Sequence, residues 1–327
     1  MIFSFRRAAA RNVISAGVTV IAVVSLAGRT NAQVPGAQQL VGRWDLKVRD
    51  ANGRSYPSWL EVTVSGTSTL VGRFVGRTGS ARPISRVELA DGVVRFSIPP
   101  QWDREKADLR LEARVEADSL VGTVTLPNGA QDSFTATRSP RLQRAASPSW
   151  GQPISLFNGK DLDGWTAVGR TNGWRVIDGV LTIASLGANL VTTQKFNDFK
   201  LHVEFRYPKG GNSGVYLRGR YEVQIEDTPA REWPEDIDLG AVYGFLTPNQ
   251  SAGARPNEWQ SFDITLVGRR VTVVLNGRTI IADQIIPGIT GGALDSDEAA
   301  PGPILLQGDH TAVEFRSIVL TPAKPAS

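Results

Sequence analysis

The chain has 327 residues, enough for two domains with their own cores, and no cysteine, which excludes disulfides, thiolate metal ligands and cysteine nucleophiles. Its formal net charge of +4 comes from the first 32 residues, which hold four arginines and no acid; removing them leaves 36 − 4 = 32 basic against 32 acidic residues. A balance near zero gives no basic patch of the kind that nucleic-acid-binding proteins carry.

Residues 1–32 predict a cleaved signal peptide. Three arginines precede the apolar stretch 13–27, and Thr30 and Ala32 put small residues at the two positions that signal peptidase reads. The apolar stretch is shorter than the roughly 20 residues that a membrane-spanning helix needs. We therefore expect a periplasmic or secreted protein with no membrane attachment after cleavage.

Residues 36–140 predict a small β-domain, either a meander barrel or a sandwich, whose function the sequence leaves open. Its strand-like segments are 43–48, 59–64, 70–75, 84–89, 93–98, 109–115, 120–125 and 133–137. Many short strands separated by turn residues are typical of such folds. The Gly42-x-Trp44 pattern resembles the opening of lipocalin-type barrels. Residues 141–153 contain Pro148 and Pro153 and have no hydrophobic periodicity, so they are expected to be a linker.

Residues 154–322 predict a second all-β domain. Its strand-like segments are 174–177, 180–184, 199–207, 214–218, 221–226, 241–245, 261–267, 271–275, 278–282, 304–307 and 312–320. Asn276 and Gly277 between two of them form a strong hairpin signal, and no amphipathic helix of useful length occurs. Antiparallel strands in this number indicate a jelly-roll β-sandwich.

Alternation along three of these strands gathers polar side chains on one expected face. A three-residue connection at 219–221 would set Arg218 opposite Glu222 and Tyr216 opposite Gln224 while keeping the apolar residues together. The shared face would hold His202, Glu204, Arg206, Tyr216, Arg218, Glu222 and Gln224. Two interpretations stay open: a solvated face with cross-strand ion pairs, or a face whose planar groups bind sugar hydroxyls.

Several segments of the second domain carry a resemblance to a known family. They are 156–165, 212–218, 221–225, 240–244, 258–259 and 306–318. In this order they resemble the 3-keto-disaccharide hydrolases, also described as 3-keto-glucoside 1,2-lyases and 3-keto-2-hydroxyglucal hydratases. Ser317 and Gln260 depart from residues that the family usually has. The resemblance covers 154–322 and implies a concanavalin-like, lectin-like jelly roll.

The resemblance implies a chemistry in which a C3 ketone acidifies the C2 proton of a small glycoside or keto-sugar. A base removes that proton, the enolate is held, and the C1 substituent leaves by β-elimination, after which water can add. His310, Glu204 and Glu222 are candidates for base, acid or metal ligand, and Arg218 for the group that holds the enolate. The candidate substrate-binding residues are Asn212, Tyr216, Tyr221, Gln224, Asp227 and Gln307.

No cofactor is predicted with certainty. No glycine-rich strand-to-helix turn for a nicotinamide is visible, and a divalent metal ion would suit histidine and carboxylate ligands although no tight ligand spacing occurs. The sequence predicts no oligomeric state. Two rival functions stay open: a lectin-like protein without turnover, and a retaining glycosidase, because Glu222-x-Gln224-x-Glu226 resembles the catalytic strand of laminarinase-like enzymes.

Overall fold

β-Strands make up nearly all regular structure in the part of the chain that the computed structural model describes, residues 37–101, 104–142, 144 and 148–324. Within these residues the only α-helix is α1 (Ala37–Leu40), and no helix is long and apolar enough to cross a bilayer. The expected signal peptide lies outside the described residues. The all-β prediction is confirmed.

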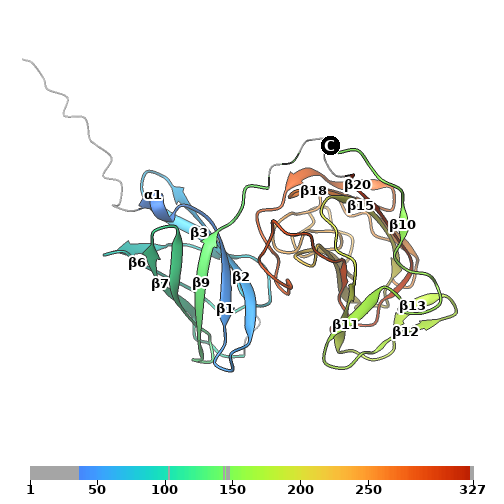
Figure 1. The fold of residues 1–327 in the computed structure, drawn as a ribbon, viewed down its shortest axis with the longest axis horizontal. Helices are drawn as coiled ribbons and strands as arrows, with labels where there is room; N and C mark the ends of the chain where they lie inside the picture. Colours follow the sequence, from blue (N-terminus) through green and yellow to red (C-terminus); the bar gives the residue numbers. More distant parts are fainter. Residues whose placement is uncertain (1–36, 102–103, 143, 145–147, 325–327) are drawn as a thin grey trace, which may run out of the picture. The chain divides into compact units, whose positions relative to one another are not determined.

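The first nine strands form one antiparallel sheet, in the order β4-β3-β2-β1-β9-β8-β7-β6-β5 (Figure 1). Their bounds are β1 (Gly42–Arg49), β2 (Ser55–Ser65), β3 (Thr69–Val75), β4 (Arg82–Ile84), β5 (Glu88–Ala90), β6 (Val93–Ile98), β7 (Leu109–Glu116), β8 (Ser119–Thr125) and β9 (Gln131–Arg138). Pairing of β1 with β9 brings both ends of the meander together. Alternate residues such as Phe134 and Ala136 point into a core that also holds Trp44 and Leu46. We call this sheet the barrel sheet.

The remaining strands form two sheets. One has the order β12-β13-β22-β15-β18-β19-β20 with β10 beside β22, and the other has the order β11-β14-β21-β16-β17. Their bounds are β10 (Ile154–Ser155), β11 (Trp165–Gly169), β12 (Trp174–Ile177), β13 (Val180–Ile183), β14 (Ala188–Thr192), β15 (Phe199–Arg206), β16 (Asn212–Leu217), β17 (Tyr221–Glu226), β18 (Gln260–Val267), β19 (Arg270–Leu275), β20 (Arg278–Ile285), β21 (Leu305–Leu306) and β22 (Glu314–Pro322).

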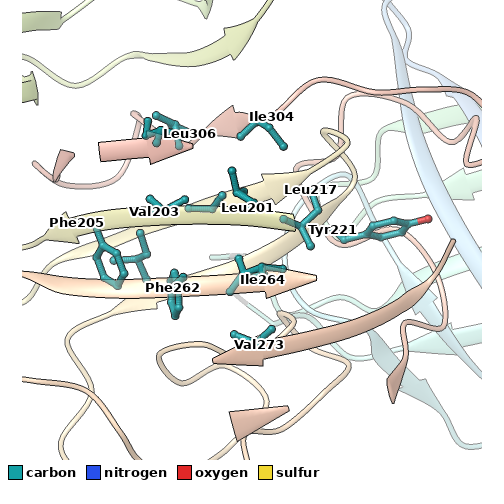
Figure 2. Packing of buried hydrophobic residues seen from close by; sticks show 14 of the residues in the cluster. Leu201, Val203, Phe205, Leu217, Tyr221, Phe262, Ile264, Val273, Ile304 and Leu306 are labelled. Carbon is teal, nitrogen blue, oxygen red and sulfur yellow. The ribbon is translucent and has the colours of Figure 1, made fainter. Parts of the chain in front are cut away.

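The core of the sandwich follows from alternation along its strands. In β15, Leu201, Val203 and Phe205 are buried, as the sequence predicts, and the residues between them face outward. Figure 2 shows these side chains in one apolar cluster with residues of β18 and β19 and with Leu217 and Leu306 of the other sheet. The five-stranded sheet therefore has one face on this core, and its other face carries the polar residues.

Two hairpins show how turn residues set the register. At Asn276 and Gly277 both φ values are positive, 49° and 77°, and Leu275 pairs with Arg278 as expected for the Asn-Gly signal. The connection between β16 and β17 differs from the prediction, because Leu217 pairs with Tyr221 and Tyr216 with Glu222.

The cause of this difference is the position of the turn. Arg218 and Gly219 both have positive φ, 53° and 65°, and the Arg220 N–H donates to the Leu217 C=O at 3.1 Å. The loop is therefore 218–220 and not 219–221. The predicted pairings of Arg218 with Glu222 and of Tyr216 with Gln224 are both wrong, because Gln224 pairs with Gly214, but the shift keeps Tyr216, Glu222 and Gln224 on one face.

The described residues from Ala37 onward belong to one compact unit. Two residues on the outside of the barrel sheet, Trp59 and Val75, are fully buried and belong to the apolar cluster of the sandwich. Trp59 packs edge-to-face on Phe245 with 5.3 Å between ring centroids.

Candidate functional site

The polar face of the five-stranded sheet lines a cavity of about 150 Å³. β16 and β17 supply its floor, and the residues after β21 and the loop at Gly291 supply its sides. The lining residues are Thr78, Gly79, Asn189, Asn212, Tyr216, Glu222, Gln224, Tyr243, Gly291, Gly292, Gln307, Asp309 and His310. We call this cavity the central pocket.

The polar face is not a solvated one. Tyr216, Glu222 and Gln224 are exposed by only 2%, 4% and 4%, while Val215 and Val223 on the opposite face are buried in the core. Burying polar groups costs free energy unless they form hydrogen bonds, so a buried polar face indicates hydrogen bonding within the protein or to a ligand. The interpretation as a solvated face is wrong for β16 and β17.

Glu222 is the buried carboxyl of the pocket. Burial raises its pKa from 4.5 to about 8, against the opposing effect of the hydrogen bond that Tyr216 donates to the ionised carboxylate, so the carboxyl is largely protonated at neutral pH. Tyr216 Oη lies 2.9 Å from Glu222 Oε2 and 2.9 Å from the Gly291 carbonyl oxygen. Because a phenol has a single proton, both contacts are satisfied together when protonated Glu222 donates to Tyr216 and Tyr216 donates to Gly291.

Gly214 makes room for this carboxyl. It lies on β16 on the same face as Tyr216, and a Cβ at this position would overlap the Glu222 Oε1 atom. A glycine in the middle of a strand weakens that strand, so the close approach of a neighbouring group is its structural reason.

His310 and Asp309 form a hydrogen-bonded pair that lines the same pocket as Glu222. The His310 Nδ1 atom lies 2.7 Å from Asp309 Oδ1, and His310 is about half exposed. The hydrogen bond to Asp309, together with the negative charges of Asp309 and Glu226, raises the pKa of His310 above its ordinary 6.5, although partial burial acts in the opposite direction. With the Nδ1 proton donated to Asp309, the Nε2 atom of neutral His310 is a proton acceptor.

A set of reciprocal hydrogen bonds ties the His310 segment to β16. The Asn212 N–H donates to Thr311 Oγ1 at 2.6 Å, and the Thr311 hydroxyl and N–H both donate to the Asn212 carbonyl, at 2.9 and 3.2 Å. The Gln307 N–H also donates to the Gly214 carbonyl at 3.0 Å. The backbone that carries His310 is therefore fixed relative to the strand that carries Tyr216.

Two side-chain oxygens in the pocket lack protein partners. Gln224 Oε1 and Gln307 Oε1 are buried and accept no hydrogen bond from the described residues. Unsatisfied buried acceptors are uncommon in proteins, and each one gains from a hydroxyl donor supplied by a ligand. A polyhydroxylated molecule such as a sugar offers such donors.

The described residues include no group of three or more His, Cys, Asp or Glu side chains placed to hold a metal ion. Asn212 Nδ2 donates to Glu226, which occupies that carboxylate. The residues of the pocket therefore do not fit a metal centre, and the chemistry below uses side chains alone.

Six of the predicted site residues lie together in the central pocket: Asn212, Tyr216, Glu222, Gln224, Gln307 and His310. Sequence reasoning did not single out Asp309, Asn189, Tyr243, Gly291 or the barrel residues Thr78 and Gly79. Asp309 stands next to His310 in the Gln307-Gly-Asp-His310 motif, which is the one signal that could have indicated it.

Two predicted catalytic residues lie elsewhere. Glu204 is on β15 in the other sheet, where Arg316 donates to both carboxylate oxygens, at 2.8 and 3.3 Å, and lowers its pKa. His202 lies on the same outer face, 2.7 Å from Asp263. Arg218 is fully buried and donates to the carbonyls of Glu298 and Gly268. The prediction that these residues share a face with Glu222 is wrong, because β15 pairs with β18 and β22 and because Arg218 is part of the turn.

Two predicted substrate-binding residues also lie outside the pocket. Tyr221 faces the core, and its hydroxyl accepts a hydrogen bond from Arg218 at 3.0 Å. Asp227 follows β17 and accepts a hydrogen bond from the Gly210 N–H at 2.7 Å. Both have structural partners that account for their residue type.

Comparison with known proteins places the second part of the chain in a family. A family model described as the 3-keto-alpha-glucoside-1,2-lyase-like domain matches residues 152–321, just over half of the 327 residues. A 3-keto-disaccharide hydrolase of Bacteroides thetaiotaomicron is 29% identical over 100 residues, which cover 27% of this chain and 34% of that relative. The matched segment thus spans about a third of the relative.

Among solved structures, a Parabacteroides distasonis protein described as a candidate glycosyl hydrolase is 30% identical, with 54% of this chain and 92% of that chain covered at a TM-score of 0.45. Another protein of the same organism and description is 26% identical, with 52% and 98% covered at a TM-score of 0.42. The family match over more than half of its length shows that this chain belongs to the 3-keto-alpha-glucoside-1,2-lyase-like family.

Proposed function

We propose that the protein is an exported enzyme that cleaves 3-keto-glycosides at C1, with His310 as the base and Glu222 as the acid of the central pocket. The observation that carries the proposal is that a buried, largely protonated carboxyl and a histidine held by an aspartate line the same pocket. Titratable groups whose pKa values are shifted by burial and by specific partners are typical of acid–base sites.

The first step is removal of the C2 proton. Neutral His310 takes this proton on Nε2, and the C2–H bonding pair becomes the enolate of C2, C3 and the C3 oxygen. Asp309 stabilises the imidazolium that forms, since its carboxylate lies on Nδ1. A histidine whose pKa is raised above 6.5 can take up and release protons near neutral pH.

Because Arg218 lies outside the pocket, another group must donate a hydrogen bond to the enolate oxygen. Asn189 is one such donor, because its Oδ1 accepts from the Gly308 N–H at 2.9 Å and leaves its Nδ2 protons for the pocket. Preorganised donors of this kind stabilise developing negative charge. Gln224 Oε1 and Gln307 Oε1 accept sugar hydroxyls and fix the ring.

The second step expels the substituent. The enolate pair forms the C1–C2 double bond as the C1–O bond breaks, and Glu222 gives its proton to the departing oxygen. Ionised Glu222 then takes one proton from water as the water oxygen bonds to C1, and His310 returns its proton to C2, which completes a net hydrolysis and restores both groups. Carbon, oxygen and proton counts balance with water as the only co-reactant.

The proposal is tested by turnover of a 3-keto-glucoside. His310→Gln is expected to reduce turnover by roughly 10²–10⁴, the range for loss of general acid–base help. Glu204→Gln is the matched control, because Glu204 lies on the outer face of the other sheet. Sugar binding by the wild type without any turnover would instead support the lectin-like function, and cleavage of an ordinary glucoside would support a glycosidase.

Export rests on the sequence of residues 1–32. Amino-terminal sequencing of the protein from its own host should find a chain that begins after Ala32. A chain that begins at Met1 would contradict export by a cleaved signal peptide.

A further inference from the structure

The central pocket has one wall that comes from the barrel sheet. Residues 76–81 connect β3 to β4, and Thr78 and Gly79 of this connection line the pocket together with Tyr216 and Glu222. The Gly292 N–H donates to the Arg77 carbonyl at 3.1 Å. Gly291 packs backbone to backbone against the same connection, because a Cβ on Gly291 would stand 2.8 Å from the Gly79 nitrogen.

The contact between the 76–81 connection and Gly291 is linked to Glu222 through Tyr216. The Gly291 carbonyl accepts a hydrogen bond from the Tyr216 hydroxyl, and the same hydroxyl is hydrogen-bonded to the Glu222 carboxyl. The 76–81 connection therefore supports the backbone on which the Tyr216–Glu222 pair depends. Trp59 on the neighbouring strand β2 holds the connection in place, because the Trp59 ring is buried in the sandwich cluster. The Arg73 guanidinium stacks over the rings of Trp59 and Phe245.

The size of the pocket gives the wall a role in recognition. Its 150 Å³ is below the roughly 300–1,000 Å³ that is usual for ligand sites, so it encloses only part of a disaccharide. The rest of the substrate must extend past the rim. Thr78 is exposed and lines the pocket, which places its side chain at that rim.

We propose that the 76–81 connection of the barrel sheet is a specificity-determining wall of the glycoside site, with Thr78 in contact with the part of the substrate that extends from the pocket. This inference rests on the proposed function and adds a role for the amino-terminal β-domain. It predicts that a change at Thr78 acts according to the size of the C1 substituent and leaves the proton-transfer groups unchanged.

The test compares Thr78→Trp with Thr67→Trp, a matched control in the exposed turn between β2 and β3. KM and kcat are measured for a methyl 3-keto-glucoside and for a 3-keto-disaccharide. Thr78→Trp is expected to raise the ratio of the KM for the 3-keto-disaccharide to the KM for the methyl 3-keto-glucoside at least tenfold. Thr67→Trp is expected to keep the wild-type ratio.

A second measurement does not depend on activity. Hydrogen exchange of the Gly292 amide should be protected in the wild type and faster in Gly291→Ala, whose added Cβ pushes the connection away. If the wild type turns over the substrate and Thr78→Trp leaves the KM ratio unchanged, this inference is overturned and the proposed function stands. An unprotected Gly292 amide in the wild type would also overturn this inference. Absence of turnover by the wild type, with the Gly292 amide protected, would overturn the proposed function and leave the wall as a structural contact only.

Discussion

Glu222→Gln is expected to stabilise the protein at alkaline pH although it removes the proposed acid of the central pocket. Folding carries the carboxyl from an unfolded pKa of 4.5 to about 8, because burial penalises the charged form. A folded pKa above the unfolded one means that the native state binds the extra proton. Stability is therefore lost as pH rises from about 4.5 to about 8.

The magnitude follows from these two values. At ~1.36 kcal/mol for each tenfold change in proton affinity, the difference between 4.5 and about 8 amounts to about 5 kcal/mol above pH 9. At pH 7 the same group costs about 3 kcal/mol. Glutamine keeps the shape of the protonated carboxyl and cannot ionise, so the variant avoids this cost.

The assay is urea unfolding of the wild type and Glu222→Gln at pH 6, 7, 8 and 9. The variant should gain stability over the wild type as pH rises, by a few kcal/mol across the series. Glu204→Gln is the control: Arg316 lowers the Glu204 pKa, so its effect has the opposite sign and is constant over this pH range. Parallel wild-type and Glu222→Gln curves would refute the assignment of Glu222 as a protonated buried acid.

Two further predictions concern the same groups. The plot of kcat/KM against pH should be bell-shaped, rising through the His310 pKa above 6.5 and falling near 8 as Glu222 ionises, and Asp309→Asn should move the rising limb to lower pH; a limb that does not move would exclude His310 as the base. Gly214→Ala should reduce turnover at least tenfold, because its Cβ displaces the Glu222 carboxyl, while circular dichroism stays that of a folded β-protein; unchanged turnover would show that the carboxyl position is not critical.

Local patterns predicted the parts of the fold that depend on neighbouring residues in the chain. Alternation in β15, β16 and β17 identified the core faces, since successive side chains point to opposite sides of a strand. The Asn276-Gly277 turn was predicted for a similar reason, because its two residues accept positive φ. Membership of the pocket for Tyr216, Glu222 and Gln224 follows from the same alternation.

Long-range pairing was beyond these patterns. Glu204 and Glu222 have the same alternation, but β15 pairs with β18 and β22 while β17 pairs with β16, so the two carboxyls lie in different sheets. Arg218 could not be placed because a positive φ is uncommon for arginine, and the turn began one residue earlier than Gly219 suggested. Nothing in residues 76–81 indicates that they line a pocket of another sheet.

The central claim is that C1 cleavage proceeds through loss of the C2 proton, and product analysis in D₂O tests it most directly. The wild type is incubated with a 3-keto-glucoside in D₂O, beside a buffer-only sample that measures spontaneous exchange, and the sugar product is examined by NMR. Elimination followed by hydration takes the new C2 hydrogen from solvent or from a base in exchange with it, so the account predicts a product that carries deuterium at C2. A product that is cleaved at C1 and keeps its original C2 proton would contradict the account, because direct displacement at C1 never breaks the C2–H bond.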